Sequence, residues 1–427
     1  MRKGLFYILG LDKKTFSSNF ILIATVLAMV AITVTPLLYN AKILMRLWIV
    51  LLVLTFGYIL KTNISIKKFA ILGAIFILFC IIYKILGISS AEMGYCVSSP
   101  ILFFAPIIAL VIIERCESQS QVRFIFHFIS LVIAINVLDS IRLTYTLRLE
   151  DVVYQRLAET IAEENGATNL NLGGSMFVNM VVFYTDVMFF TLMKSKKLLE
   201  KIIFLLYFVI GVYFIVMCSL KASAVLLLLV SVILMYLAKK GERKFNRMIV
   251  LSFIVVGAFF LFRDEILNFL ISTIDSTRVS SRISAFLTTS EVSDSSTFMA
   301  RQNLWMVSLQ SWLGNATSFV FGIGDHAWNE FSSTEASGIG NHSDLFDVLG
   351  RYGILGGLLL YSSITILHNY LRKKYGLSYK YEILSFFILI ILMGLTKKFF
   401  VGQPAIVIVI LFPLSLKYCY NEKKELF

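Results

Sequence analysis

Charged residues are scarce in this chain of 427 residues: only 15% are Asp, Glu, Lys or Arg, whereas 58% are hydrophobic. The mean hydropathy is +0.83. A typical soluble domain has about 25% charged and about 45–50% apolar residues. This composition excludes an ordinary soluble fold and indicates an integral membrane protein.

Motifs for nucleotides, metals and dinucleotide cofactors are missing as well. The sequence contains no GxxxxGK[ST] phosphate loop, no HExxH pair and no GxGxxG run. We therefore expect no cofactor and no metal. No internal repeat typical of many secondary transporters occurs either. The five cysteines show no CxxC spacing and are expected to be buried free thiols: Cys80, Cys96, Cys116, Cys218 and Cys419.

Long apolar runs recur through the whole chain, and many approach the roughly 20 residues that cross a bilayer as a helix. Because a helix satisfies its own backbone hydrogen bonds in lipid, these runs predict an all-α, polytopic fold of about twelve spans. The predicted spans are 20–39, 43–60, 69–88, 98–114, 122–141, 176–193, 199–218, 222–238, 248–262, 346–368, 381–400 and 404–418.

Basic residues predict the orientation of these spans. With both termini in the cytoplasm, clusters such as Lys194-Ser-Lys196-Lys197 and Arg372-Lys373-Lys374 fall inside. The short outer turns hold few cations: Lys42, Arg46, Lys221, Lys397 and Lys398. The net charge of +13 thus mainly reflects the orientation of the spans in the membrane. Because the cations lie on the predicted cytoplasmic side, anionic lipid head groups are more favoured partners than nucleic acid.

Two polar segments are predicted on the outer side, at about 142–175 and 263–344. The second carries nine acids and four arginines, and its residues Trp305, Leu309, Trp312 and Leu313 have the spacing of an amphipathic interfacial helix. We divide the chain into an N-terminal membrane part (1–262), a large extracytoplasmic loop (263–345) and C-terminal spans (346–427).

Four histidines are candidates for proton transfer. His342 stands in the polar loop just before the run at 346–368. On spacing alone, His127, His326 and His368 are expected to be packed or turn-forming residues, and the same holds for His342. None of them is therefore assigned a role by its position.

Acidic residues and glycines near apolar runs also have ordinary explanations. Asp347 precedes Arg351 by four positions, so a local ion pair is the default expectation. Asp186 needs a partner or water, because an ionised carboxylate in mid-bilayer costs about 2.5–3.5 kcal/mol or more. Gly353-Ile-Leu-Gly356-Gly357 is expected to allow close packing of helices.

The segment 301–361 contains a longer ordered pattern. Its parts are Arg301-Gln-Asn-Leu-Trp305, Gly322-Ile-Gly324, His342-Ser343 and Arg351-Tyr-Gly353-Ile-Leu-Gly356. This order resembles the C-terminal core of the O-antigen polymerase and ligase superfamily: an Arg, a Trp, a GxG turn, a variable loop, His-Asn and a glycine-rich helix start.

The turn Ser219-Leu-Lys221-Ala-Ser223 resembles a Ser-Arg-Gly-like outer turn of the same family. Two positions depart from the pattern. Ser343 stands where Asn is usual, and Lys221 stands where Arg is usual. Lysine keeps the positive charge but lacks the bidentate fork with which arginine binds phosphate oxygens. The role of Lys221 in phosphate binding is therefore less well defined than that of an arginine at this position.

The resemblance implies a GT-C-like, Wzy-type polysaccharide polymerase of the bacterial cytoplasmic membrane, an inverting and metal-independent glycosyltransferase. It would join polyprenyl-pyrophosphate-linked repeat units on the outer face, with His342 as general base, since a histidine of reference pKa about 6.5 can accept a proton near neutral pH. The implied pyrophosphate-binding residues are Arg301, Lys221, Arg282, Arg278, Arg142 and Arg148, and the implied supporting residues are Asp344, Asp347 and Arg351. Implied partners are lipid-linked oligosaccharides, membrane lipids and a chain-length regulator protein.

Two alternatives remain open at this level. An O-antigen ligase or protein O-oligosaccharyltransferase would use the same donor and another acceptor, so it would keep the same histidine and cations. A non-enzymatic lipid-linked oligosaccharide flippase would also fit the number of spans. The absent repeat and the concentration of polar residues in one outer loop argue against the flippase.

Overall fold

The computed structural model describes residues 13–38, 40–89, 93–116, 118–146, 175–218, 222–238, 298–324, 343–397 and 399–424. Every regular element within these residues is helical, as predicted. The elements are α2 (Lys13–Val34), η1 (Pro36–Leu38), α3 (Ala41–Leu60), α4 (Ile64–Ile85), α5 (Met93–Phe104), α6 (Ile107–Arg115), α7 (Gln119–Thr146), α9 (Ser175–Lys194), α10 (Leu198–Tyr213), η4 (Phe214–Cys218), α11 (Ala222–Ala238), α15 (Phe298–Leu313), α16 (Ala316–Phe321), α17 (Asp344–Thr396), α18 (Gly402–Ala405), η6 (Ile406–Leu411) and α19 (Phe412–Lys424).

Seven helices of the described residues are long and apolar enough to cross a membrane. Two shorter apolar helices, Leu22–Val34 and Ser223–Ala238, accompany them. The chain is therefore an all-α polytopic membrane protein. The total of twelve spans stays a prediction, and the span expected at 248–262 lies outside the described residues.

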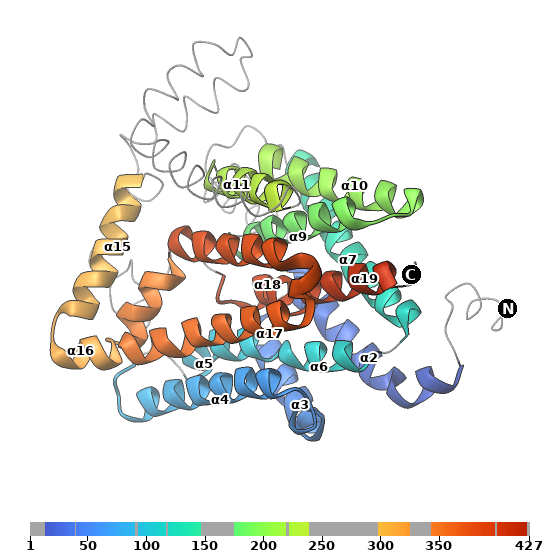
Figure 1. Cartoon of the computed structure of the whole chain (residues 1–427). Coiled ribbons are helices and arrows are strands. Elements are labelled where there is room, and N and C mark those ends of the chain that lie inside the picture. Colours follow the sequence, from blue (N-terminus) through green and yellow to red (C-terminus); the bar gives the residue numbers. More distant parts are fainter. Residues whose placement is uncertain are drawn as a thin grey trace, which may run out of the picture.

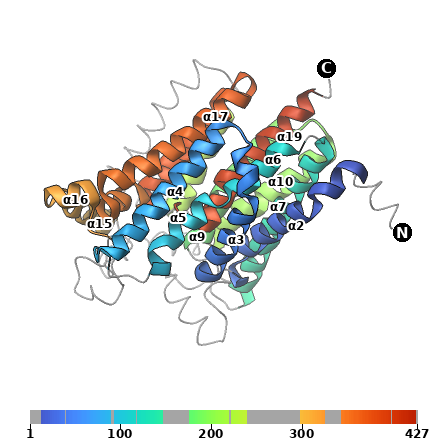
Figure 2. The ribbon, with the colours of Figure 1, turned by 90° about the horizontal axis from the view of Figure 1, so that it is seen from below.

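The long helices run side by side, and the short helix pair α15–α16 lies at one end of the bundle (Figures 1 and 2). In Figure 1, α15 crosses this end instead of following the direction of the long helices. Its exposed apolar side chains include Met306 and Leu313. A helix thus forms at the predicted position, and its location at the membrane interface stays a prediction.

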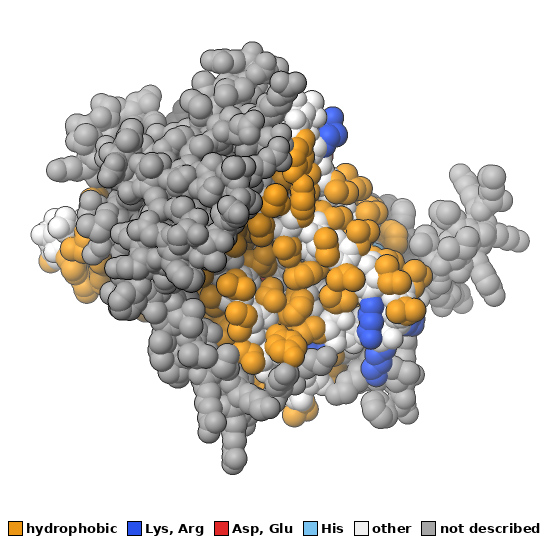
Figure 3. All heavy atoms as spheres, turned by 90° about the horizontal axis from the view of Figure 1, so that it is seen from above, with side chains coloured by type: hydrophobic (Ala, Val, Ile, Leu, Met, Phe, Trp, Pro, Cys, Tyr) orange, Lys and Arg blue, Asp and Glu red, His pale blue; other side chains and the backbone are white. Residues whose placement is uncertain are grey.

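The centre of the bundle is formed by three segments. The best apolar window of Gly402–Asn421 is wholly buried, and that of Cys96–Arg115 is almost wholly buried. Most of the best apolar window of Met176–Lys194 is buried as well, whereas less than a third of the corresponding windows of Ile64–Ile85 and Leu198–Cys218 is buried. In the coloured part of Figure 3 hydrophobic side chains dominate the surface, and basic side chains appear toward its right-hand side. The outer helices thus present the apolar surface that lipid requires.

Helix α17 differs most from the sequence expectation of two separate spans. Its backbone leaves helical geometry at Gly353 and again at Tyr379, where φ is −139° and ψ is 30°. At the second break the chain reverses, so that the last part of α17 returns along the bundle (Figure 1). The helical conformation continues through the basic residues 372–374, which lie between the predicted spans 346–368 and 381–400, and ends at Thr396 instead of 400.

The predicted span 98–114 is also interrupted. Helix α5 ends at Phe104 and α6 begins at Ile107, with Pro106 between them. Proline lacks the N–H group that would continue the helical hydrogen bonds. Near this break, Gly73 of α4 lets the ring of Phe104 approach, since a Cβ atom there would lie 2.5 Å from Phe104 Cγ.

Ion pairs join the helices at the end where Tyr379 lies, which is the predicted cytoplasmic end. Lys194 of α9 pairs with Glu382 of α17, and Lys374 of α17 pairs with Glu114 of α6. Lys417 of α19 donates to backbone carbonyls at the end of α6, 2.5 Å from Ile113 O and 2.7 Å from Cys116 O. Cations at the carboxyl end of a helix are favourable for the helix dipole.

Candidate functional site

The GxG turn of the sequence pattern lies directly against the first break in α17. The Ile323 N–H donates to Gly350 O at 2.9 Å, and the Gly324 N–H donates to Arg351 O at 2.8 Å. These two hydrogen bonds connect backbone to backbone. They fix the chain that leaves α16 against the beginning of α17.

Glycine is required at this contact, which we call the glycine clasp (Gly322, Gly324 and Gly353). All three residues have positive φ values, of 76°, 78° and 63°. A Cβ atom on Gly322 would lie 2.3 Å from Arg351 O, and one on Gly353 would lie 2.3 Å from Val320 O. Gly353, expected to permit helix packing, is therefore needed for its backbone conformation.

The amino end of α17 begins with Ser343, the residue that follows His342 in the chain. Ser343 is buried and caps the helix, with its Oγ accepting from Phe346 N. The same hydroxyl donates to Gly394 O at 2.9 Å, at the far end of α17. The Ser343 N–H donates to Asp347 Oδ2 at 3.0 Å. The hydroxyl and the backbone N–H of Ser343 are thus both held in place.

Asp347 links α17 to the crosswise helix α15. Its second oxygen, Oδ1, accepts from Ser308 Oγ at 2.8 Å, and both residues are buried. The sequence had suggested Arg351 as the partner of Asp347. The hydrogen bonds from Ser308 and Ser343 show that this carboxylate also joins α15 to the start of α17. Hydrogen bonds to a charged acceptor are stronger than those between neutral groups.

Asp344 holds a third segment at the same place. Its Oδ2 accepts from the backbone N–H of Phe399 and of Phe400, the latter at 2.5 Å. The Asp344 N–H in turn donates to Lys397 O at 3.3 Å. The turn between α17 and α18 is therefore fixed to the first turn of α17. The role of Asp344 in supporting His342 stays a prediction.

Helix α15 meets the start of α17 through Trp305 and Ser308. Trp305 contacts Phe346 of α17, with ring centroids 5.7 Å apart, and Ser308 binds Asp347. Arg301 precedes these residues by four and seven positions in α15. Positions i, i+4 and i+7 share one helix face, so position 301 is on the face of α15 that carries Trp305 and Ser308. The side chain of Arg301 lies outside the described residues. The junction of α15, the start of α17 and the turn after α17 is called the outer junction below, after the side of the membrane on which the sequence predicts it.

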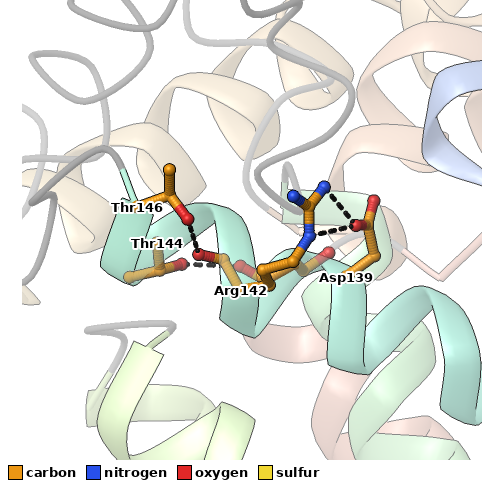
Figure 4. Close-up of polar contacts among 5 residues, drawn as sticks. Asp139, Arg142, Thr144 and Thr146 are labelled. Carbon is orange, nitrogen blue, oxygen red and sulfur yellow. Dashed lines mark hydrogen bonds and ion pairs between the residues drawn. The ribbon is translucent and has the colours of Figure 1, made fainter.

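Arg142 has a different setting. It lies in α7, whose main helix contacts are with α2, α10 and α19. Figure 4 shows its guanidinium paired with Asp139 one turn earlier, with Nε at 3.0 Å and Nη2 at 2.8 Å from Oδ1. The structure thus places Arg142 in an exposed local ion pair. Its predicted contact with pyrophosphate stays a prediction.

Several predicted residues fall outside the described part of the chain: His342, Lys221, Arg148, Arg278, Arg282 and His326. Among the described residues, no group of three or more His, Cys, Asp or Glu side chains is placed to hold a metal ion.

The other two histidines are packed against aromatic rings, as expected. The ring of His127 stacks on Phe204 at an interplanar angle of 2°. His368 meets Phe387 edge to face, with centroids 4.9 Å apart. Both lie on other parts of the bundle than the outer junction, His127 in α7 and His368 in the middle of α17.

Asp186 was expected to face a partner or water. It is fully buried in α9, and within the described residues neither carboxyl oxygen has a hydrogen-bond partner. Ser231 of α11 lies beside it, but its hydroxyl donates to Leu228 O at 2.9 Å. The expected satisfying contact is therefore missing from the described residues.

Sequence reasoning missed Ser308, Gly394 and the backbone of 397–400. A weak signal existed for Ser308, which lies on the helix face of Arg301 and Trp305. No local signal could have joined Asp344 to Phe399 and Phe400, which are more than fifty positions away. No protein-family model matches the chain, and no curated protein matches it significantly. Its function is therefore argued from the residues themselves.

Proposed function

We propose that the chain is a polysaccharide polymerase that joins polyprenyl-pyrophosphate-linked repeat units at the outer face of the cytoplasmic membrane. The observation that carries this proposal is the anchoring of Ser343. The residue after His342 is held by α17 itself, by Gly394 and, through Asp347, by α15. A general base needs such a fixed attachment, because proton transfer depends on placement within hydrogen-bond reach.

The proposed reaction is one displacement. The hydroxyl oxygen of the acceptor sugar attacks the anomeric carbon of the donor glycan, and His342 takes the hydroxyl proton. The bond from the anomeric carbon to the pyrophosphate oxygen breaks, and polyprenyl pyrophosphate leaves with the bonding electrons. Negative charge grows on the leaving group, where Arg301 would stabilise it by charge-assisted hydrogen bonds.

The membrane setting agrees with such a substrate. A polyprenyl chain stays in the bilayer, so the reacting pyrophosphate lies near the membrane surface. Helix α15 crosses the end of the bundle (Figure 1) and carries exposed apolar residues. That arrangement suits a surface at the level of the head groups. The activated donor also supplies the energy, which accords with a sequence that lacks a nucleotide-binding motif.

The test uses purified protein, in lipid, with a synthetic lipid-linked repeat unit. We expect wild-type protein to form a ladder of chain lengths on a gel. His342→Ala should lower the rate by about 10²–10⁴-fold, the usual contribution of a positioned general base. The control is His368→Gln, which alters a half-buried histidine packed on Phe387. It should retain the ladder.

Two outcomes would decide against the proposal. Normal chain lengths from His342→Ala would remove the histidine from the reaction. Transfer of the glycan to a lipid A core or a protein, with no lengthening of lipid-linked units, would identify a ligase instead. In both cases the folded state of each variant is checked by its elution from a size-exclusion column.

A further inference from the structure

The corner where α15 turns into α16 exposes apolar side chains although it lies outside the bundle of long helices. This α15–α16 corner comprises residues 312–321, and Figure 1 shows it at one end of the bundle. Leu313 is 60% exposed, and Phe319 and Phe321 are each 41% exposed. The sequence has no charged residue from 302 to 324. Large apolar side chains gathered at one place, with no charge among them, mark a contact with another apolar phase or molecule.

Polar groups of the corner form hydrogen bonds within the corner itself. The Trp312 indole N–H donates to Phe319 O at 2.9 Å, and the two rings stack with centroids 5.1 Å apart. The Ser318 N–H donates to Asn315 Oδ1 at 2.8 Å, and the Asn315 N–H donates to Ser318 Oγ at 3.0 Å. The Gly322 N–H donates to Ser318 O at 2.7 Å. Solvent would satisfy these groups in water, whereas hydrocarbon requires that they find partners inside the protein.

The apolar surface of a spanning helix reaches this corner. Helix α4 is long and apolar enough to cross a membrane, and it leaves Ile82, Ile85 and the following Leu86 exposed at its carboxyl end. A Cβ atom on Gly324, just beyond the corner, would lie 2.6 Å from Ile88 O. The end of α4 and the chain that leaves α16 are therefore in close contact. The exposed surface of α4 thus connects the corner with the bilayer.

We propose that the α15–α16 corner inserts its apolar side chains into the hydrocarbon of the nearest membrane leaflet, which is the outer leaflet in the predicted orientation. The sequence predicts only that α15 lies along the membrane surface. The inference adds α16 and the turn before it, with Leu313, Phe319 and Phe321 as the inserted side chains. Gln310 and Thr317 are exposed and polar, so the insertion is shallow, at the depth of about 5–10 Å that is typical of interfacial helices.

Such an insertion ties the outer junction to the height of the lipid surface. Helix α16 leads directly into the glycine clasp, whose backbone hydrogen bonds hold it against α17. Ser308 of α15 binds Asp347 of α17. The corner is therefore connected to the start of α17 through both of its helices. This membrane contact is independent of the reaction proposed above and holds whichever reaction the chain catalyses.

The experiment attaches a nitroxide spin label to full-length protein in liposomes, at Leu313→Cys and, in a separate variant, at Phe321→Cys. Collisions of the label are measured with oxygen, which dissolves in hydrocarbon, and with a nickel chelate that stays in water. The oxygen-to-nickel collision ratio should be several-fold higher at both sites than at Lys196→Cys, an exposed position between α9 and α10. Ile75→Cys, exposed in the middle of α4, supplies the reference for lipid. Wild-type protein gives the background from the native cysteines.

Two other results would overturn the proposal. Frequent collisions with the nickel chelate at residue 313 would mean that the corner faces water. Rare collisions with both reagents would mean that a protein surface covers it, and spectral broadening that disappears on dilution with unlabelled protein would identify that surface as a second copy of the chain. Both substitutions alter exposed side chains, and elution from a size-exclusion column checks the folded state. If one variant does not fold, the other decides.

Discussion

Replacing Gly353 with alanine tests whether the glycine clasp supports the outer junction. The backbone of Gly353 has φ 63° and ψ −165°, a conformation that is essentially restricted to glycine. Forcing an alanine into it costs about 1–3 kcal/mol. The added Cβ would also lie 2.3 Å from Val320 O and 2.6 Å from Gly322 N. Both are backbone atoms with little freedom to move, and such overpacking costs about 1–3 kcal/mol more.

We therefore expect Gly353→Ala to lower the free energy of unfolding by about 2–6 kcal/mol, the sum of these two costs. The measurement is equilibrium unfolding in mixed micelles, followed by tryptophan fluorescence. The matched control is Gly57→Ala in α3, where a Cβ would meet no atom within 4 Å. Because alanine favours the helix over glycine, this control should be neutral or stabilising by about 0.5–1 kcal/mol.

The reasoning would be refuted by an unfolding curve of Gly353→Ala that coincides with that of wild type. It would also be refuted if Gly57→Ala were the more destabilised of the two. Either result would mean that α17 can straighten at residue 353 without loss. The GxG turn would then have no fixed surface to bind.

Further predictions concern the charged groups and the orientation. Arg301→Ala should abolish long polymer while folded protein remains in the membrane, and Arg301→Lys should rescue only in part, as judged on chain-length gels. Asp344→Ala should destabilise by about 2–5 kcal/mol, since two buried backbone donors lose a charged acceptor, and Asp344→Asn should cost less in the same unfolding assay. Asp186→Asn should leave the unfolding temperature unchanged or raise it; a fall of several degrees would reveal a cationic partner. Cysteine labelling of intact cells should modify Ser337→Cys from outside and leave Lys196→Cys protected, and the reverse pattern would contradict the proposed orientation.

Hydropathy was sufficient to predict most of the membrane architecture. The runs around α4, α7, α9 and α10 were located to within a few residues, because apolar length is a local property of the sequence. The ends of α17 were predicted less accurately. Its helix continues through Arg372-Lys373-Lys374, and charged residues with good helix propensity extend a helix beyond the part that hydropathy detects.

The candidate site was less accessible to sequence reasoning. The pattern around Gly322 and Gly353 was visible, but the positive φ values that explain it are tertiary properties. Asp344 was expected to support the site, but its hydrogen bonds from the backbone of Phe399 and Phe400 could not be predicted. Such partners meet only when two ends of α17 come together after the reversal at Tyr379. No window of consecutive residues contains that information.

The complete burial of residues 402–419 has a consequence for how the protein is made. This segment is synthesised after the helices that surround it, so those helices enter the membrane while their central partner is still missing. Its polar residues Gln403, Ser415 and Lys417 are buried in the finished protein and would be costly if they faced lipid. Insertion of this segment and closure of the bundle are therefore one event. A defect in either should leave a bundle with an open centre, which membrane proteases can recognise.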